Sequence, residues 1–462
     1  MTHGLRRVVI GWGGLSIAAL ACAGACATAP AYQKPSMPAP VTWDTAENWR
    51  PAAPADRLPR GAWWTIFHDD ALSGLETQVI GANATIAGAT ARYEQARALA
   101  SVASAANYPL IDANASATQE RPAGTTLKLG GTASYEVDLF GKRARNIDVA
   151  RAAESGAADD LENVRLVLTA DLAANYFTLR RLDREIDVVT QSLQVLERAL
   201  VLIQARHDGG LVSGLDVAQQ QTLIESTRTQ STLLKDQRAS VEHAIAVLVG
   251  QPAPGFRVAP APMPATMPAF DVTTPSDLLE RRPDIASAER AIAAANARLG
   301  IARTAFFPTL TLFGSAGFKA DSLLKILDVP SLVWAVGSSM AQGVFDGGAR
   351  KAREQFAAAG YDAAVADYRA VTLRAFREVQ DSLTTLAAVE QARTSQARAV
   401  AAAERAVAIV NSRYAGGLSN ALDVVISQQS LLNAQRAAVQ LDGARLIATV
   451  QLIKAMGGGF DN

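Results

Sequence analysis

The residues of this chain that could take part in chemistry are its two cysteines and its four histidines. The histidines are far apart and lack the short spacing by which side chains share a metal ion: His3, His68, His207 and His243. The cysteines, Cys22 and Cys26, both stand near the N-terminus, so the body of the chain has no disulfide. Their position favours attachment of a lipid to a thiol, and we expect no metal and no other cofactor.

An export signal accounts for this position. Arg6 and Arg7 precede an apolar run from Val8 to Leu20, which small residues follow. A cysteine directly after such a run is the expected target for lipid attachment and cleavage in bacteria. The run is shorter than the ~20 residues that span a membrane comfortably, so a lipidated signal is favoured over an uncleaved helical anchor. Neither cysteine has leucine three residues before it, and the pattern alone leaves Cys22 and Cys26 open.

Two other motifs have structural explanations. An Arg-Arg-Pro-Asp run, residues 281–284, is typical of a helix start, where the helix dipole favours an aspartate. The glycines of 457–459 follow no strand and precede no Lys-Ser/Thr pair, so they are not a phosphate-binding loop.

The overall charge is balanced. Lys+Arg and Asp+Glu both total 44, so no net charge points to nucleic acid. Without a cluster of titratable residues, we predict that the chain is not an enzyme.

Long helices dominate the predicted structure. The segment 27–60 is rich in proline and cannot form regular helix. Helical periodicity starts near Ala71 and runs to about Ala105. A second run extends without proline from Lys142 to about His207, which at ~1.5 Å per residue is on the order of 100 Å long. A glycine turn and a returning helix from about Leu215 to Val249 complete a long antiparallel pair.

Strand periodicity appears between the helices. From Leu127 to Leu139 apolar or small residues alternate with polar ones, and a weaker alternation covers 111–118. The residues from Arg121 to Thr126 form the predicted loop of this hairpin.

The same order of helices and strands then repeats in the second half of the chain. The second half has a helix over 276–304, alternating residues from Leu310, a strand over 332–345, and helices over 348–412 and 422–456. The two turns match at seven of twelve positions when residue 206 is aligned with residue 413. Identical pairs include Arg206 with Arg413, Gly209 with Gly416, Gly210 with Gly417, and Asp216 with Asp423.

The predicted organisation therefore has six parts. They are a signal peptide (1–25), a lipid-anchored proline-rich tether (26–70), a first repeat (71–250) with its β-hairpin at 107–140, a proline-rich linker (251–275), a second repeat (276–456) with its hairpin at 308–346, and a C-terminal tail (457–462). Four strands per chain are too few to close a membrane barrel, which needs about eight. Several chains must therefore join, and strands continued by helices would make a tube.

The sequence resembles the TolC-like outer-membrane efflux proteins, and most closely their lipoprotein branch, the NodT or OprM type. The resemblance covers essentially the whole mature chain. Its motifs are Cys26 through Pro30 with Tyr32 and Pro35; Trp63, Trp64 and Phe67; Ser134-Tyr-Glu-Val-Asp-Leu-Phe-Gly141; Leu278-Leu-Glu-Arg-Arg-Pro-Asp-Ile285 with Glu289; Phe306-Phe-Pro308; and Gly457-Gly-Gly459. The first of these motifs selects Cys26 as the lipidated residue.

The resemblance implies a mainly helical fold with a small β portion. Three copies would form a 12-stranded β-barrel in the outer membrane, continued by a periplasmic helical barrel. This channel would receive small molecules from an inner-membrane efflux transporter through a periplasmic adaptor. The helix tips would close it like an iris.

The same resemblance implies which residues form this gate. Asp423 matches an aspartate of the tips, and Leu422 matches an apolar constriction. Ile426 stands where many members have a second aspartate. An acidic ring at this place would therefore have one carboxylate per chain instead of two. Tyr414 and Asp216 match a pair that links neighbouring helix pairs in the closed state. The alternative for the aspartates is helix capping, and for the tyrosine it is packing between helices.

Two other functions compete with the channel. A periplasmic adaptor lipoprotein also has a long helical hairpin and a lipid, but it predicts one hairpin and compact β domains. The chain has two helical pairs with strands inside the repeats. A secreted enzyme would need titratable residues clustered away from the helix tips, and the sequence shows none.

Overall fold

The computed structural model describes residues 61–122, 124–264, 281–325 and 327–458. The predicted signal peptide, both cysteines and most of the tether lie outside these ranges, as does part of the 251–275 linker. The chain divides into two units. We call residues 91–158 and 287–370 the sheet unit, and residues 61–90, 159–286 and 371–458, where described, the tip unit. Among the described residues, no helix has the length and apolar character that a membrane crossing needs.

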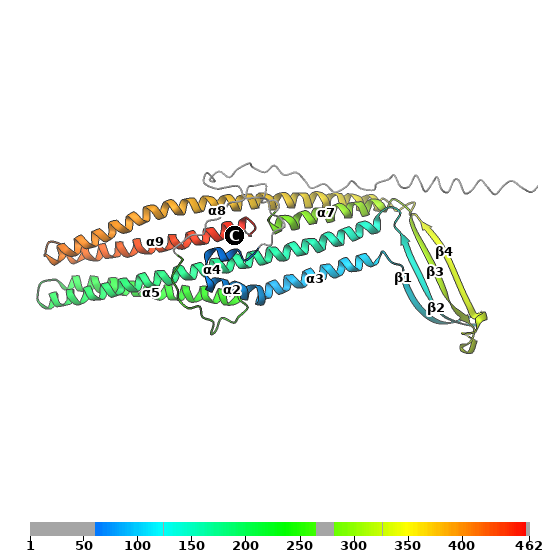
Figure 1. Ribbon diagram of the computed structural model, residues 1–462, viewed down its shortest axis with the longest axis horizontal. Coiled ribbons are helices and arrows are strands. Elements are labelled where there is room, and N and C mark those ends of the chain that lie inside the picture. The colour runs from blue at the N-terminus through cyan, green and yellow to red at the C-terminus, as the bar shows by residue number, and fades with distance from the viewer. Residues whose placement is uncertain (1–60, 123, 265–280, 326, 459–462) are drawn as a thin grey trace, which may run out of the picture. The chain divides into compact units, whose positions relative to one another are not determined.

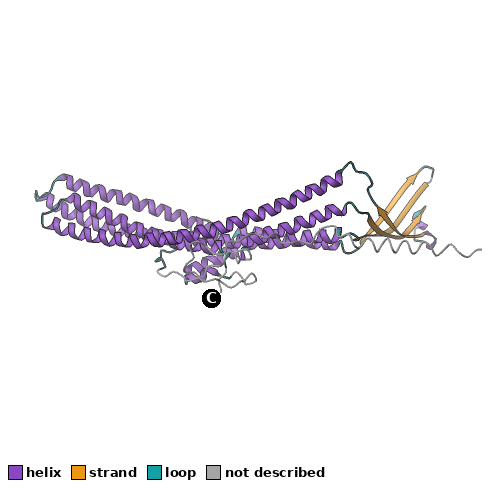
Figure 2. Ribbon diagram, turned by 90° about the horizontal axis from the view of Figure 1, so that it is seen from above, coloured by secondary structure: helices purple, strands orange, loops and turns teal. Residues whose placement is uncertain are grey.

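The sheet unit contains one antiparallel sheet of four strands, orange in Figure 2. The strands are β1 (Leu110–Glu120), β2 (Gly124–Val137), β3 (Thr309–Ala320) and β4 (Leu332–Ala341), in the order β1-β2-β3-β4. The two hairpins predicted from the sequence are therefore joined, because β2 pairs with β3. The outer edges of β1 and β4 have no strand beside them in the described chain.

The register gives this sheet two different faces, since residues directly opposite each other share a face. We call one the apolar face; it carries Ile111, Leu127, Leu129, Tyr135, Val137, Leu310, Leu312, Phe318, Leu332, Trp334, Val336 and Met340. We call the other the polar face; it carries mostly polar side chains, among them Asp112, Asn114, Ser116, Lys128, Thr132, Glu136, Thr309, Thr311, Ser315, Lys319 and Ser339. Many of the apolar side chains are exposed in the single chain, among them Ile111, Trp334 and Val336.

Small residues bring the two hairpins close together. Gly130 and Gly317 stand opposite each other on the polar face of the β2–β3 pair. A Cβ on Gly317 would lie 2.4 Å from the carbonyl oxygen of Leu129, and one on Gly130 would lie 2.6 Å from that of Ala316. Only hydrogen fits at these two positions.

The helices confirm the duplication by their lengths. In the first half α3 (Ala84–Ala105), α4 (Lys142–Asp208) and α5 (Gly214–Leu248) have 22, 67 and 35 residues. In the second half α7 (Pro283–Thr304), α8 (Ala349–Ala415) and α9 (Ala421–Ala455) have the same 22, 67 and 35 residues. Figure 1 shows α4 beside α5 and α8 beside α9, each joined by a short turn. The predicted helix-pair repeat is thus present twice.

The first helix differs from its prediction. A single helix was expected from Ala71 to Ala105, but α2 (Asp70–Ala82) ends before Asn83 and α3 begins after it. The Asn83 side-chain oxygen accepts hydrogen bonds from the backbone N–H groups of Thr85 and Ile86, at 2.8 and 3.2 Å. Its amide donates to the carbonyl oxygen of Leu248, 2.8 Å away. Asn83 therefore starts α3 and ties it to the end of α5.

The end of the predicted tether is part of the helical body. Trp63–Phe67 forms a 3₁₀ helix, η1, with Trp63, Trp64 and Phe67 buried. The Trp63 indole donates to the Thr169 hydroxyl at 3.2 Å, and the Phe67 ring lies 4.7 Å from that of Phe177. Aromatic packing on α4 thus holds the chain from residue 63 onward.

Strand β4 is shorter than predicted. The sequence predicts a strand to Phe345, but β4 ends at Ala341, opposite Thr309 at the start of β3. Pro308 precedes Thr309 and has no N–H to donate, so the partner strand ends there. The residues after Ala341 consequently have nothing to pair with on β3.

A buried ionic network joins the two repeats within the tip unit. The Glu185 carboxylate on α4 is 1 % exposed and accepts from Arg436 on α9 at 2.8 and 3.0 Å. Arg181 and Gln440 donate to the same carboxylate at 2.8 and 3.1 Å. Apolar side chains of α4, α5 and α9 pack beside it: Leu182, Val188, Val189, Leu234, Leu432 and Val439.

Candidate functional site

The two turns at the ends of the long helices, at the left of Figure 1, have the same geometry. In the first, the N–H of Leu211 donates to the carbonyl oxygen of Arg206 at 2.9 Å, and Gly210 has a φ of 71°. In the second, Leu418 donates to Arg413 at 2.8 Å, and Gly417 has a φ of 74°. This hydrogen bond needs a residue with a positive φ just after the helix, and glycine adopts that conformation without strain. Gly209 and Gly416, one residue earlier, donate to the carbonyl oxygens of Ala205 and Ser412.

Both predicted gate aspartates cap the helix that follows the turn. The Asp216 carboxylate accepts from the backbone N–H and the hydroxyl of Ser213, both at 2.9 Å. The Asp423 carboxylate accepts from the Ser419 hydroxyl at 2.6 Å, while its own N–H donates to the Asn420 side chain at 2.8 Å. Negative charge in the first turn also interacts favourably with the helix dipole. Within one chain, the capping interpretation therefore describes both residues.

Tyr414 lies between the two helix pairs. Its side chain is buried in a cluster with Ile203, Val217, Ala421 and Val424. The guanidinium carbon of Arg206 lies 4.8 Å from the centre of its ring, and Arg206 also donates to its carbonyl oxygen at 3.3 Å. The two turns are thus held together by a cation–π contact and a hydrogen bond.

The hydroxyl of Tyr414 is buried and has no hydrogen-bond partner among the described residues. The structure brings Tyr414 close to Arg206 and joins it by no hydrogen bond to Asp216 of the same chain. A buried hydroxyl without a partner costs on the order of 1–3 kcal/mol. A neighbouring molecule that supplied an acceptor would remove this cost.

The other predicted gate residues are exposed and apolar. Leu422 and Ile426 stand four residues apart on α9, and their side chains are 43 % and 56 % exposed. Residues at this spacing share one helix face. The leucines of the two turns are more exposed still: Leu211, Leu215 and Leu418. The tips thus carry an apolar surface that one chain leaves uncovered, beside two capped carboxylates.

Sequence reasoning named the residues of the turns but missed Ser213 and Asn420. A signal for them existed, because a serine or asparagine three residues before an acidic residue is typical of a helix N-terminus. Among the described residues, no group of histidine, cysteine, aspartate and glutamate is arranged to hold a metal ion. The site therefore offers hydrogen bonding, charge and apolar contact.

Comparison with known proteins identifies the family. The family model described as "Outer membrane efflux protein" matches residues 76–251 and 274–458. The pyoverdine export outer membrane protein OpmQ of Pseudomonas aeruginosa is 31 % identical, over 96 % of each chain. The toluene efflux pump outer membrane protein TtgF of Pseudomonas putida is 30 % identical, over 97 % of each.

Solved structures agree with these relatives. The outer-membrane channel OprN matches with a TM-score of 0.87 and 27 % identity, covering 94 % of this chain and 99 % of that one. The outer membrane protein VceC of Vibrio cholerae matches with a TM-score of 0.82 and 28 % identity, covering 86 % and 99 %. The resemblance stated from the sequence motifs, and the mainly helical fold with a small β portion that it implied, are therefore confirmed. The chain belongs to the outer membrane efflux protein family, and it is an outer-membrane channel protein of efflux and not an enzyme.

Proposed function

We propose that three copies of this chain form one exit channel of a tripartite efflux pump. The channel conducts small molecules passively from a periplasmic adaptor and an inner-membrane transporter to the exterior. The observation that carries the proposal is the four-stranded sheet, with one apolar face, one polar face and two unpaired edges.

The unpaired edges of the sheet indicate that it pairs with further copies of the chain. Strands β1 and β4 have 11 and 10 residues, and their outer peptide groups have no strand to pair with in the described chain. Long unpaired edges are unfavourable, and in a membrane every backbone group needs a partner. Pairing β4 of one copy with β1 of the next satisfies both edges. Three copies then close twelve strands, with the apolar face toward lipid and the polar face toward water.

The partners follow from the same family. The relatives include a toluene efflux pump outer membrane protein and a pyoverdine export protein, each named as the outer-membrane component. A passive channel needs an inner-membrane transporter to drive export and an adaptor to join the two. An adaptor role for this chain itself, the alternative reading of the sequence, does not agree with these relatives.

The gate is proposed to lie at the helix tips. The buried Tyr414 hydroxyl lacks a partner within its own chain, and a bond to Asp216 of the neighbouring copy would satisfy it. Leu422 and Ile426 form an apolar ring, and Asp423 is the carboxylate in the first turn of α9 beside them. Opening must break the hydrogen bond and separate these apolar side chains.

Cys26 is proposed to carry the lipid, which anchors the chain to the inner leaflet of the outer membrane. Its spacing to Pro30, Tyr32 and Pro35 supports this assignment. The helical part then extends into the periplasm.

Single-channel conductance in planar bilayers tests the proposal. We expect small, infrequent openings for the natural protein and larger, frequent ones for Tyr414→Phe and Asp216→Ala, because phenylalanine lacks the hydroxyl that donates the proposed bond and alanine lacks the carboxylate that accepts it. Arg398→Gln is a matched control, because Arg398 is exposed on the same helix as Tyr414 and bonds only Ser395 within the described chain. Bilayers that stay silent for all of these proteins would contradict the channel.

A further inference from the structure

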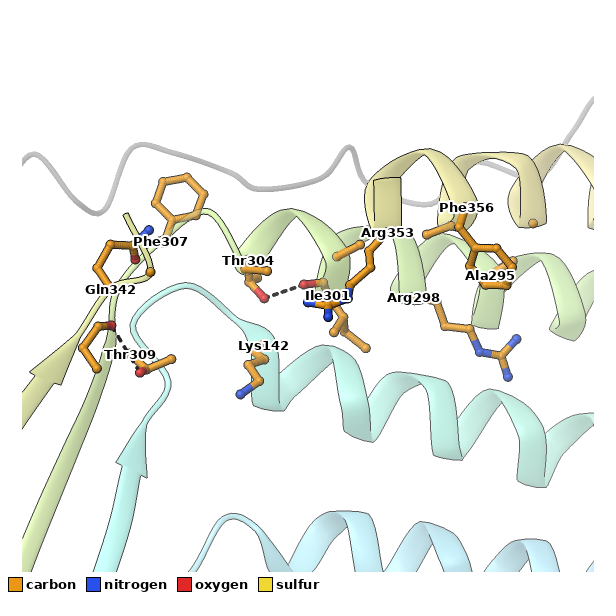
Figure 3. Close-up of a pocket in the computed structure, with 16 residues that line it drawn as sticks. Lys142, Ala295, Arg298, Ile301, Thr304, Phe307, Thr309, Gln342, Arg353 and Phe356 are labelled. Atoms are coloured by element: carbon orange, nitrogen blue, oxygen red, sulfur yellow. Dashed lines mark hydrogen bonds between the residues drawn. The ribbon is translucent and has the colours of Figure 1, made fainter. Parts of the chain in front are cut away.

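The sheet unit contains a cavity of about 1000 Å³ where its strands meet its helices. Figure 3 shows its walls: Arg298 and Ile301 come from α7, Arg353 and Phe356 from α8, and Lys142 from the start of α4. The last residue of β4 and the first residue of β3 also line it. A volume of this size is at the upper end for small-molecule sites.

Most of the cavity wall is apolar. Ile301, Phe307 and Phe356 supply large apolar surfaces, and four alanines and two glycines leave room between them: Ala295, Ala302, Ala305, Ala357, Gly343 and Gly360. Phe356 is 83 % exposed, so the described chain leaves its ring uncovered. Such a wall suits a flat apolar ligand.

The charges in the wall have one sign. Lys142, Arg298 and Arg353 line the cavity, and none of the described lining residues is an aspartate or a glutamate. Lys142 is bound to the Glu136 carboxylate at 3.0 Å. Within the described ranges, by contrast, Arg298 and Arg353 have neither a hydrogen bond nor an ion pair. Two guanidinium groups are thus available to an anion.

The cavity opens on the side of the polar face. Thr309 and Ala341 line it, and they are the last opposed pair of that face. Lys142 also lies on that side, because its partner Glu136 belongs to the polar face. In the proposed channel this face surrounds the water-filled interior, so the cavity is reached from the lumen.

We propose that this cavity is a transit site for small amphipathic organic anions, with an aromatic or other flat apolar body and a sulfonate, carboxylate or phosphate group. The guanidinium group of Arg298 or that of Arg353 can bind an anionic group through two parallel N–H donors. The apolar wall covers the body of the ligand. This inference rests on the proposed function and names the substrate class that the lumen favours.

Calorimetric titration of the full-length assembled protein in lipid nanodiscs tests the site, with empty nanodiscs as background. The probe is naphthalene-1-sulfonate, and the cation 1-naphthylmethylammonium is its counterpart with the same ring system. We expect the sulfonate to bind the natural protein and the cation to bind at least about tenfold more weakly. In Arg298→Gln/Arg353→Gln we expect the sulfonate affinity to fall roughly tenfold, which corresponds to about 1.4 kcal/mol, because both guanidinium charges are lost.

Lys351→Gln/Arg369→Gln is the matched control. Both residues are exposed on α8 outside the cavity, and the change removes the same charge. Its sulfonate affinity should stay within about twofold of the natural value. Equal binding of the two probes, or equal loss of affinity in both double variants, overturns the proposal. So does a cavity variant whose trimer dissociates while each chain stays folded, because the arginines then serve contacts between copies.

Channel current separates this inference from the function on which it rests. Added naphthalene-1-sulfonate should reduce the single-channel current of Tyr414→Phe at a lower concentration than the cation does. Conductance without any preference for the anion contradicts only the transit site. A protein that never conducts contradicts the proposed channel, whatever the calorimetry gives.

Discussion

The guanidinium group of Arg206 stacks on the ring of Tyr414, with 4.8 Å from its central carbon to the ring centre. The two residues are 208 positions apart and belong to the turns of different repeats. Their contact holds the two helix pairs of one chain together at the tips.

Removing this contact should loosen the tips without unfolding the body. Arg206→Ala loses a cation–π contact and a hydrogen bond, together about 1–2 kcal/mol. We expect faster hydrogen exchange of backbone amides in 408–424 and more frequent channel opening. Arg398→Ala should leave both unchanged. Unaltered exchange in Arg206→Ala would show that the apolar cluster around Tyr414 holds the tips by itself.

Burial of Glu76 should make the stability of the tip unit depend on pH. The side chain is fully buried, neither oxygen has a partner among the described residues, and burial raises the pKa of its carboxyl from 4.5 to about 9. The folded chain keeps this group protonated while the unfolded chain ionises it. Stability is therefore fully present below pH 4.5 and falls as the pH rises toward 9.

The variant Glu76→Gln should remove this dependence, because glutamine does not ionise. Melting temperatures measured at pH 5 and pH 8 should differ less for the variant than for the natural protein. Glu94→Gln, which changes an exposed glutamate of α3, serves as the control. If the melting temperature of Glu76→Gln depended on pH as much as that of the natural protein, other groups would be responsible for the dependence.

A methyl group at Gly317 should block pairing of the two hairpins. The added Cβ would lie 2.4 Å from the Leu129 carbonyl oxygen, and the strand backbone cannot move away without losing its register. We expect Gly317→Ala to lose most of the assembled oligomer on unheated SDS gels. Gly314→Ala lies in the same strand with its nearest backbone atom 3.9 Å away, and it should assemble normally. Normal assembly of both variants would show that the sheet tolerates the wider spacing.

Loss of the Glu185 carboxylate should destabilise the junction of the repeats. Glu185→Ala leaves Arg181 and Arg436 without their buried partner, and breaking a buried ion pair costs about 3–5 kcal/mol. The midpoint of urea unfolding should fall accordingly. Asp187→Ala breaks the exposed pair with Arg184 on the same helix and should change stability by less than about 1 kcal/mol. Similar midpoints for the two variants would contradict the role of the network.

Lipid attachment should depend on Cys26 alone. Cys26→Ser should give a protein without the mass of a lipid, and Cys22→Ser should keep it. Intact-mass spectrometry of membrane-extracted protein distinguishes the two. If Cys22→Ser lost the lipid and Cys26→Ser kept it, the attachment site would be Cys22.

Local patterns predicted the elements of this fold well. The uninterrupted helical period fixed α4 and α8 to within three residues at each end, because no proline breaks either run. Alternation located the strands, and the repeated turn residues revealed the duplication. These features depend on neighbours in sequence, which a single chain displays directly.

Features that depend on distant partners escaped prediction. The break at Asn83 requires the carbonyl oxygen of Leu248, and the burial of Trp63 requires Thr169 on α4. The contact between Arg206 and Tyr414 likewise has no local signature. The gate residues themselves came from family resemblance, because periodicity says nothing about contacts between copies.

The equal lengths of the paired helices constrain how this protein can change. One inserted residue in α4 would shift the residues beyond it by ~1.5 Å and rotate them by about 100° relative to their counterparts in α8. The two turns would then no longer present matching surfaces to a shared partner. We therefore expect an insertion or deletion in α4 to be tolerated only when α8 changes by the same number of residues, so that the lengths of these two helices change together.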